Sequence, residues 1–183
     1  ADRGVRVRVL IDDMFTGGYD AGMAGLESHA NIEIRVFNPF ARRGARFLDA
    51  LTSFSRINRR MHNKSFTMDN QMTLIGGRNI ADEYFGAHID AKFGDLDVIG
   101  VGPVVQDVSA MFDEYWNHER AAPVEAFANM PDDPAAELER VRAELADTLE
   151  IIRDSKYAAA VEDKVLEMIE SDPSVFSWAP YTL

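Results

Sequence analysis

The residues of this chain best suited to chemistry lie in one short segment, Met61 to Asn79. In it, His62 and Lys64 are two positions apart, so both side chains lie on one face if this stretch is a β-strand. An imidazole can act as a nucleophile or as a general acid–base near neutral pH. An ammonium group supplies a point charge for a phosphate oxygen. The pair therefore favours phosphodiester chemistry through a covalent phosphohistidine.

The spacing of this segment predicts a β-hairpin. Two runs of alternating residues, about Met61–Met68 and Met72–Gly77, flank the turn-forming residues Asp69-Asn70-Gln71. With the turn centred near Asn70, Lys64 falls opposite Gly76 in the second strand. We therefore expect the lysine beside a stretch of backbone that carries no side chain.

Glycines at the end of the hairpin leave room for an anion. Gly76 and Gly77 let a phosphate approach main-chain N–H groups, and Asn79 can add an amide donor. We predict that these three residues and Lys64 bind phosphate, while His62 carries the chemistry. The ordinary alternative is a hairpin with a hydrogen-bonded histidine and a surface lysine, but it does not account for the whole spaced set.

The elements that position this hairpin alternate between strand and helix. The β-branched residues of Val5–Ile11 recur with a period of two and predict a strand, and a helix is expected from about Tyr19 to His29. Further strands are predicted at Ile32–Phe37 and Leu96–Val101, with another helix from about Val104 to Asn117. This order predicts an α/β lobe with a mixed, mostly parallel sheet flanked by helices.

The character of the sequence changes after Met130. Apolar residues then recur at spacings of three and four in two stretches, Leu138, Val141, Leu145, Leu149 and Ile152, and Val161, Val165, Met168 and Ile169. We predict a pair of amphipathic helices packed on the lobe, which divides the chain into an α/β lobe (1–130) and a helical extension (131–183). A coiled coil or a membrane-surface face is disfavoured, because the polar faces are acidic and anionic lipid repels them.

Composition and charge exclude several classes of function. The 183 residues carry a formal net charge of −12 and contain no cysteine. These values argue against a general nucleic-acid binder and remove thiolate metal sites and cysteine nucleophiles. Between Arg35 and Lys64, eight basic residues face one acidic residue, and this basic island suggests a local anionic partner. Asp12 and Asp13 lack a matching ligand cluster, so we expect them to support a loop rather than a metal.

The spaced set His62-x-Lys64-x4-Asp69-x6-Gly76-Gly77-x-Asn79 resembles the HKD motif of the phospholipase D superfamily. Further segments look like the N-terminal half of the bacterial cardiolipin synthase-like branch of that superfamily, namely Phe37–Phe40, Arg59–Lys64, Ile75–Asn79, Asp95–Val98 and Phe112–Asn117. The resemblance covers nearly the whole chain. It implies a phospholipase D-like lobe.

The resemblance also implies roles for individual residues. In the family, one HKD histidine attacks phosphorus and a second protonates the leaving alcohol, with no metal or cofactor. His62 is then the nucleophile or the acid, while Lys64 and Asn79 hold phosphate oxygens. Asp69 has a structural role at the turn. Asp97 balances the charge on the imidazole, although glutamate is more frequent at this position of the family.

Three neighbouring positions complete the expected site. Arg59 and Arg60 can meet lipid headgroups or an anionic substrate, or they can be ordinary surface arginines. Gly77 stands where many relatives have serine, so this chain lacks that hydroxyl.

The chain has one HKD motif, whereas two-motif members of the family have two. The resemblance therefore implies that a second lobe of the same polypeptide, or a second copy of the chain, completes the site. The expected function is phospholipase D-type hydrolysis or phosphatidyl transfer on a phospholipid, in a membrane-associated bacterial protein similar to cardiolipin synthase. The alternatives are a homodimeric nuclease-like phosphodiesterase, which the net charge disfavours, and a non-catalytic lobe that binds a lipid or a partner.

Overall fold

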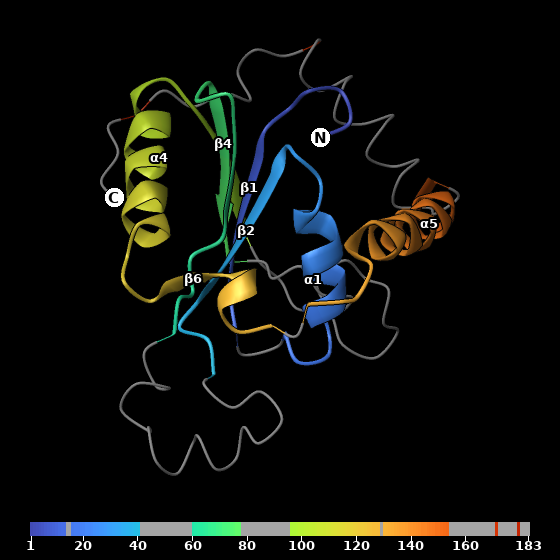
Figure 1. The fold of residues 1–183 in the computed structure, drawn as a ribbon. Coiled ribbons are helices and arrows are strands. Elements are labelled where there is room, and N and C mark those ends of the chain that lie inside the picture. The colour runs from blue at the N-terminus through green and yellow to red at the C-terminus, as the bar shows by residue number, and fades with distance from the viewer. Residues whose placement is uncertain are drawn as a thin grey trace, which may run out of the picture. The chain divides into compact units, whose positions relative to one another are not determined.

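The computed structural model describes residues 1–13, 16–40, 60–77, 96–128, 130–153, 171 and 179. They form two compact units, and Figure 1 labels most of their helices and strands. The helical unit takes its described residues from Ala1–Val7, Gly18–Ile32 and Ala128–Thr182, and the hairpin unit takes them from Arg8–Gly17 and Glu33–Phe127. Each unit has its own buried apolar residues.

The first sheet lies mostly in the hairpin unit and has the strand order β1–β2–β6. Its strands are β1 (Val7–Asp12), β2 (Ile32–Phe37) and β6 (Ala121–Pro123). β2 runs antiparallel to β6, with Val36 opposite Ala122. Ile34 and Val36 alternate along β2 and are buried, as is Val124 in the short 3-10 helix η2 (Val124–Ala126).

The second sheet contains the hairpin and has the strand order β3–β4–β5. Its strands are β3 (Ser65–Met68), β4 (Met72–Gly76) and β5 (Asp97–Val101). Both pairs are antiparallel, and Thr73 in the middle of β4 lies between Thr67 and Gly100.

One face of this second sheet is covered by helix α4 (Pro103–Trp116), which lies alongside β4 in Figure 1. The helix begins at Pro103, whose fixed φ suits the first helical position. A Cβ on Gly100 would lie 3.0 Å from Val104 Cγ1, so the helix packs directly on that strand. Val105 and Val108 of α4 are fully buried.

The opposite face of the sheet is open and apolar. Phe66, Leu74 and Ile99 stand side by side across the three strands. Their exposed fractions are 63%, 37% and 58%. The two faces of the same sheet therefore differ, because α4 buries one and leaves the other exposed.

The α/β class is confirmed, but the sheet differs from the prediction. The described strands form two three-stranded sheets, and each pair with an assigned register is antiparallel rather than parallel. The β3–β4 pair is the predicted hairpin, because a three-residue turn can join only antiparallel neighbours. The β2–β6 and β4–β5 pairs join strands that are distant in sequence, and the order of strands and helices does not reveal their relative direction.

The helical unit is built on the packing of α1 (Asp20–Glu27) against α5 (Pro134–Arg153). A Cβ on Gly25 would lie 3.0 Å from the Glu137 carbonyl carbon and from the Leu138 nitrogen, so the helices approach closely at this glycine. Met23 and Ala24 of α1 and Val141 of α5 are buried around it.

The first predicted C-terminal helix is thus confirmed as α5. Its apolar stripe is buried at Val141, whereas Leu145 and Leu149 are each 51% exposed. The second predicted helix, with Val161 to Ile169, lies outside the described residues. The helix pair and the boundary at residue 130 stay predictions. Among the described helices, none combines the length and the hydropathy needed to cross a bilayer.

Candidate functional site

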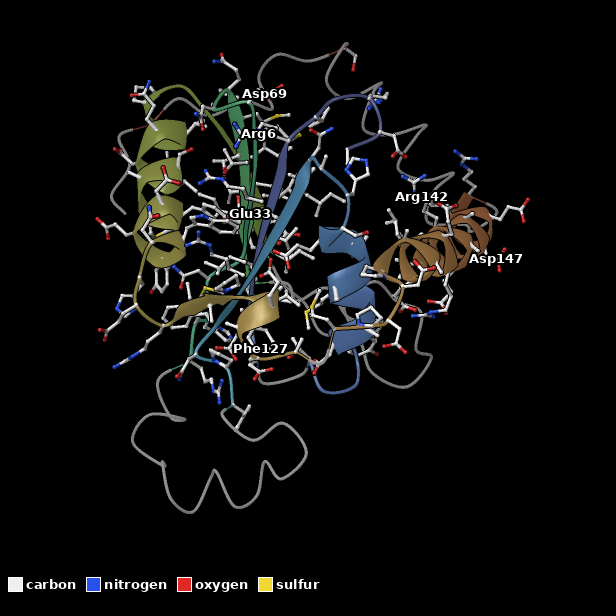
Figure 2. All side chains as sticks on the ribbon, in the orientation of Figure 1. Arg6, Glu33, Asp69, Phe127, Arg142 and Asp147 are labelled. Atoms are coloured by element: carbon white, nitrogen blue, oxygen red, sulfur yellow. The ribbon has the colours of Figure 1, made fainter. Side chains whose placement is uncertain are left out.

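The hairpin turn has the conformation that its residues favour. Asp69 and Asn70 adopt φ of 51° and 52°, and the Gln71 N–H donates to the Met68 carbonyl at 2.9 Å. Aspartate and asparagine tolerate this left-handed region better than other non-glycine residues. Figure 2 shows Asp69 at the tip of the hairpin. The predicted turn is confirmed, and Asp69 is one of the two residues that adopt its left-handed conformation.

Helix α4 holds the hairpin from one side. The Ser109 hydroxyl donates to Asn70 Oδ1 at 2.7 Å, which ties the tip to the helix. On the covered face, the hydroxyls of Thr67 and Thr73 are hydrogen-bonded at 2.9 Å, and Thr73 is fully buried. β3 and β4 are therefore fixed to each other and to α4. They provide a rigid base for Lys64 and Gly76, which lie at the end of the hairpin away from the turn.

The register of the hairpin places Lys64 as predicted. Ser65 lies opposite Ile75, and the Gly76 N–H donates to the Lys64 carbonyl at 3.3 Å. On its other side, Gly76 lies opposite Asp97 of β5. Residues directly opposite each other in a sheet share a face. Lys64, Gly76 and Asp97 therefore form a cationic, a bare and an anionic position in one row.

The Asp97 carboxylate lies across the bare position. A Cβ on Gly76 would overlap Asp97 Oδ1 and would lie 2.8 Å from Asp97 Cγ and 3.1 Å from the Leu96 carbonyl oxygen. Only glycine lets the carboxylate come this close to the β4 backbone. The group that lies against Gly76 is therefore a carboxylate of the chain itself, and the approach of a phosphate stays a prediction.

His62 lies outside the strand in which it was expected. Regular pairing begins at Ser65, and residues 60–64 have no regular secondary structure. His62 is exposed, and the Lys64 ammonium donates to its carbonyl at 2.9 Å. The predicted strand is shorter because the Met61 N–H donates to the Asp12 carboxylate at 3.0 Å instead of joining a strand.

Two neighbouring aspartates at the end of β1 hold the chain beside His62. Asp12 accepts from the Met61 N–H, and it pairs with Arg60 Nη1 at 3.3 Å. Asp13 is fully buried and accepts from the Phe40 N–H at 2.6 Å and from the Thr16 hydroxyl. These contacts agree with the predicted role in loop support. In the part of the chain that the structure describes, no acidic or histidine cluster could hold a metal ion.

The described arginines of the basic island are engaged inside the unit. The Arg60 side chain is 14% exposed, lies over the Phe40 ring at 4.6 Å and donates to the Asn38 carbonyl at 3.3 Å. The Arg35 guanidinium lies 4.6 Å from the centre of the Trp116 ring. Arg60 is therefore placed as an internal contact, which differs from the expected headgroup position. Sequence reasoning missed this contact, which nothing in the local sequence pattern signals.

The other described histidines are engaged in local structure. His29 Nδ1 accepts from the Asn31 N–H at 3.0 Å, and its Nε2 lies 3.1 Å from Asp2 Oδ1. His118 Nδ1 accepts from the Arg120 N–H at 3.1 Å. The His62 ring has no such hydrogen bond to a described residue. Of the remaining expected residues, Gly77 is exposed, while Asn79 and Arg59 lie outside the described ranges.

Comparisons with known proteins point to bacterial cardiolipin synthases. Over 175 residues, 96% of this chain, it is 45% identical to cardiolipin synthase C of Escherichia coli. It is 33% identical over 119 residues to a cardiolipin synthase of Oceanobacillus iheyensis and 32% identical over 127 residues to one of Staphylococcus aureus. The chain is homologous to a segment of bacterial cardiolipin synthases.

The similarity covers only part of these relatives. The chain spans 35% of the length of the Escherichia coli protein, 22% of the Oceanobacillus protein and 23% of the Staphylococcus protein. No protein-family model and no solved structure matches the chain. The comparisons therefore support a relation to cardiolipin synthases, while the roles of single residues rest on the geometry of the hairpin.

Proposed function

We propose that this chain carries one half of a phospholipase D-type phosphodiester site in a protein that transfers phosphatidyl groups. The observation that carries the proposal is the row of Lys64, Gly76 and Asp97, fixed by the hairpin register next to the exposed imidazole of His62. A cation and a reactive imidazole suit an anionic phosphodiester. The identity to cardiolipin synthases supports a phospholipid as the substrate.

The proposed reaction needs two imidazoles. One imidazole nitrogen bonds to phosphorus while the bond from phosphorus to the leaving alcohol oxygen breaks, and the second imidazole gives that oxygen its proton. Water or an acceptor alcohol then loses its proton to the second imidazole, bonds to phosphorus and releases the first. His62 supplies one imidazole, and a second lobe of the polypeptide supplies the other.

The remaining residues support this exchange. Lys64 and Asn79 hold the phosphate oxygens, and the main-chain N–H of Gly77 adds a neutral donor, because that of Gly76 already donates to the Lys64 carbonyl. Asp97 lies against Gly76 and counters the positive charge that develops on the imidazole. Asp69 keeps the turn that sets the register of all of them. In a whole protein of the cardiolipin synthase type, the donor is phosphatidylglycerol at a membrane surface, and the acceptor is a second phospholipid.

Lipid products test this proposal directly. The complete protein that contains this chain is incubated with phosphatidylglycerol vesicles in excess EDTA, and the lipid products are analysed by mass spectrometry. We expect cardiolipin to form and His62→Ala to lower the rate by about 10²- to 10⁴-fold. His118→Ala is the matched control, because the described contacts of the His118 ring are with the Arg120 N–H and the Phe37 ring, and not with residues 60–64.

Other outcomes separate the alternatives. Phosphatidic acid without cardiolipin would indicate hydrolysis instead of transfer. Full activity of the 183-residue chain alone would indicate that two copies complete the site. Equal rates for the wild type and His62→Ala would refute the proposal.

A further inference from the structure

We propose that Asp12 is a positioning residue for His62. This inference rests on the proposed function, since it gives Asp12 a role in the same site. Asp12 does not touch the substrate in this account. Its carboxylate fixes the backbone that carries the imidazole, and it thereby sets where the imidazole stands.

The segment that carries His62 has side-chain contacts in the Lys64 ammonium on the His62 carbonyl, at 2.9 Å, and the Asn63 amide on Met111 Sδ, at 3.5 Å, but its backbone has few supports. Residues 60–64 form neither helix nor strand, so no ladder of backbone hydrogen bonds fixes them. After His62, the Lys64 carbonyl accepts from the Gly76 N–H at 3.3 Å. Before it, the Met61 N–H donates to Asp12 Oδ2 at 3.0 Å. His62 therefore lies between two anchors, and the first of them is a side chain of β1.

The first anchor is stabilised by its surroundings. The Asp12 and Arg60 side chains are each 14% exposed, and Asp12 Oδ1 pairs with Arg60 Nη1 at 3.3 Å. Hydrogen bonds from a backbone N–H to a carboxylate are stronger than bonds between neutral groups. One carboxylate thus holds two consecutive residues, and His62 follows them directly.

Arg60 makes this anchor costly to remove. Its Nε and Nη2 atoms are buried and have no hydrogen-bond partner among the described residues. Without the Asp12 carboxylate, the guanidinium keeps the Asn38 carbonyl and the Phe40 ring, but it loses the described ion pair at Asp12. A buried charge without a counter-charge is unstable. Removal of Asp12 therefore displaces Arg60 together with Met61.

The neighbouring Asp13 has contacts in a different part of the chain. It holds the Phe40 N–H and the Thr16 hydroxyl, so it anchors the chain before residue 41. Asp12 anchors the chain after residue 59, on the side of His62. Of the two aspartates, Asp12 is the one whose described contacts include the residue adjacent to His62, so it is the one expected to act on the imidazole.

The test compares Asp12→Ala with Asp113→Ala in the complete protein. Asp113 is a matched control, because it also pairs with an arginine of the hairpin unit, Arg8 at 2.8 Å, and makes no described contact with residues 60–64. Turnover is measured at a temperature at which both variants are folded by circular dichroism. We expect Asp12→Ala to lower kcat by about 10- to 100-fold with KM within about threefold, and Asp113→Ala to keep both values.

Amide hydrogen exchange of peptides that contain residues 60–64 supplies the second readout. Exchange there should accelerate in Asp12→Ala and stay unchanged in Asp113→Ala, since only the first loses the acceptor of the Met61 N–H. If Asp12→Ala does not fold, Asp12→Asn replaces it, because the amide keeps the size and one acceptor but loses the charge for Arg60. For Asp12→Asn we expect a smaller loss of kcat, about 3- to 10-fold.

The outcomes are separable from those of the proposed function. Unchanged kcat in the Asp12 variants, while His62→Ala is inactive, would overturn the inference and leave the proposed function intact. Unchanged exchange at residues 60–64 would also overturn it. Full activity of His62→Ala would refute the proposed function and, with it, any role of Asp12 in positioning a reactive imidazole.

Discussion

Two glycines, one in each unit, mark close approaches of very different kinds. At Gly25, the atoms 3.0 Å from a Cβ belong to the backbone of α5, which cannot move without shifting the helix. At Gly76, the nearest atoms belong to the Asp97 carboxylate, which can rotate away. The same residue type thus serves helix packing in the helical unit and the placement of a charged group in the hairpin unit.

This difference predicts which quantity a substitution at each glycine changes. A side chain at Gly25 strains the packed interface between α1 and α5, so it should lower the free energy of unfolding. A side chain at Gly76 moves one carboxylate of the proposed site, so it should lower turnover. Substitutions at the two glycines, with the free energy of unfolding and turnover measured separately, therefore test this difference.

Among the glycine substitutions, the largest effect is expected from Gly76→Ala. The new Cβ forces the Asp97 carboxylate off the β4 backbone, and we expect kcat to fall by about 10- to 100-fold with little change in the melting temperature. Gly100→Ala is the control in the same sheet, because its Cβ would meet Val104 on the face that α4 covers. It should lower the melting temperature and leave kcat unchanged.

A double-mutant cycle sharpens this prediction. If Gly76→Ala acts through Asp97, then adding it to Asp97→Ala should cause no further loss of kcat. Additive losses would mean that Gly76 matters for a reason other than the position of the carboxylate.

A smaller effect, on stability alone, is expected from Gly25→Ala. Its Cβ would lie 2.8 Å from Glu137 Cγ and 3.0 Å from the α5 backbone, so we expect a loss of about 1–3 kcal/mol in the free energy of unfolding. The control in the same helix is Gly22→Ala. Its Cβ would contact Val141 Cγ2 at an ordinary 3.7 Å, and it should stabilise α1 by about 0.5–1 kcal/mol. Chemical denaturation measures both, and equal effects would contradict the packing described at Gly25.

The smallest effect is expected from an exposed ion pair on α5. Arg140 donates to both Glu137 carboxylate oxygens, at 2.5 and 3.0 Å, and this hydrogen bond lowers the pKa of Glu137 from its ordinary value of 4.5. A lowered carboxyl pKa adds stability above the unfolded-state value, and the gain is lost as pH falls through the folded-state value. The stability difference between wild type and Arg140→Met should therefore be fully present at neutral pH and should shrink as the pH falls below 4.5.

The control for this pH dependence is Arg153→Met at the end of the same helix, since Arg153 has no ion pair with a described residue. Its stability difference from the wild type should stay constant across the same pH range. A difference for Arg140→Met that does not shrink on acidification below pH 4.5 would show that the arginine acts through packing and not through its carboxylate partners Glu137 and Glu144.

Short-range features of this protein could be predicted from its sequence. The strand Ile32–Phe37 was expected with the bounds that β2 has, because its alternating β-branched residues also face a buried core. The register of Lys64 opposite Gly76 followed from the turn residues Asp69 and Asn70, whose left-handed conformation fixes the centre of the hairpin. Both features depend on neighbours in sequence.

Features that depend on distant residues could not be predicted in this way. The internal place of Arg60 and the irregular backbone before Ser65 both follow from contacts with Asp12, 48 and 49 residues earlier in the chain. The antiparallel pairing of β4 with β5 likewise joins residues far apart in sequence. Periodicity predicts which residues alternate, but it does not say which carboxylate takes a backbone N–H from a strand.

A phosphodiester site built on His62 is tested most simply by the turnover of a chromogenic phosphodiester by the complete protein in excess EDTA. His62→Ala is compared with His118→Ala, since both remove an exposed imidazole of the hairpin unit. We predict metal-independent turnover that falls by about 10²- to 10⁴-fold in His62→Ala and stays within about twofold in His118→Ala. Turnover that survives in His62→Ala, or that EDTA abolishes, would contradict a phosphodiester site built on His62.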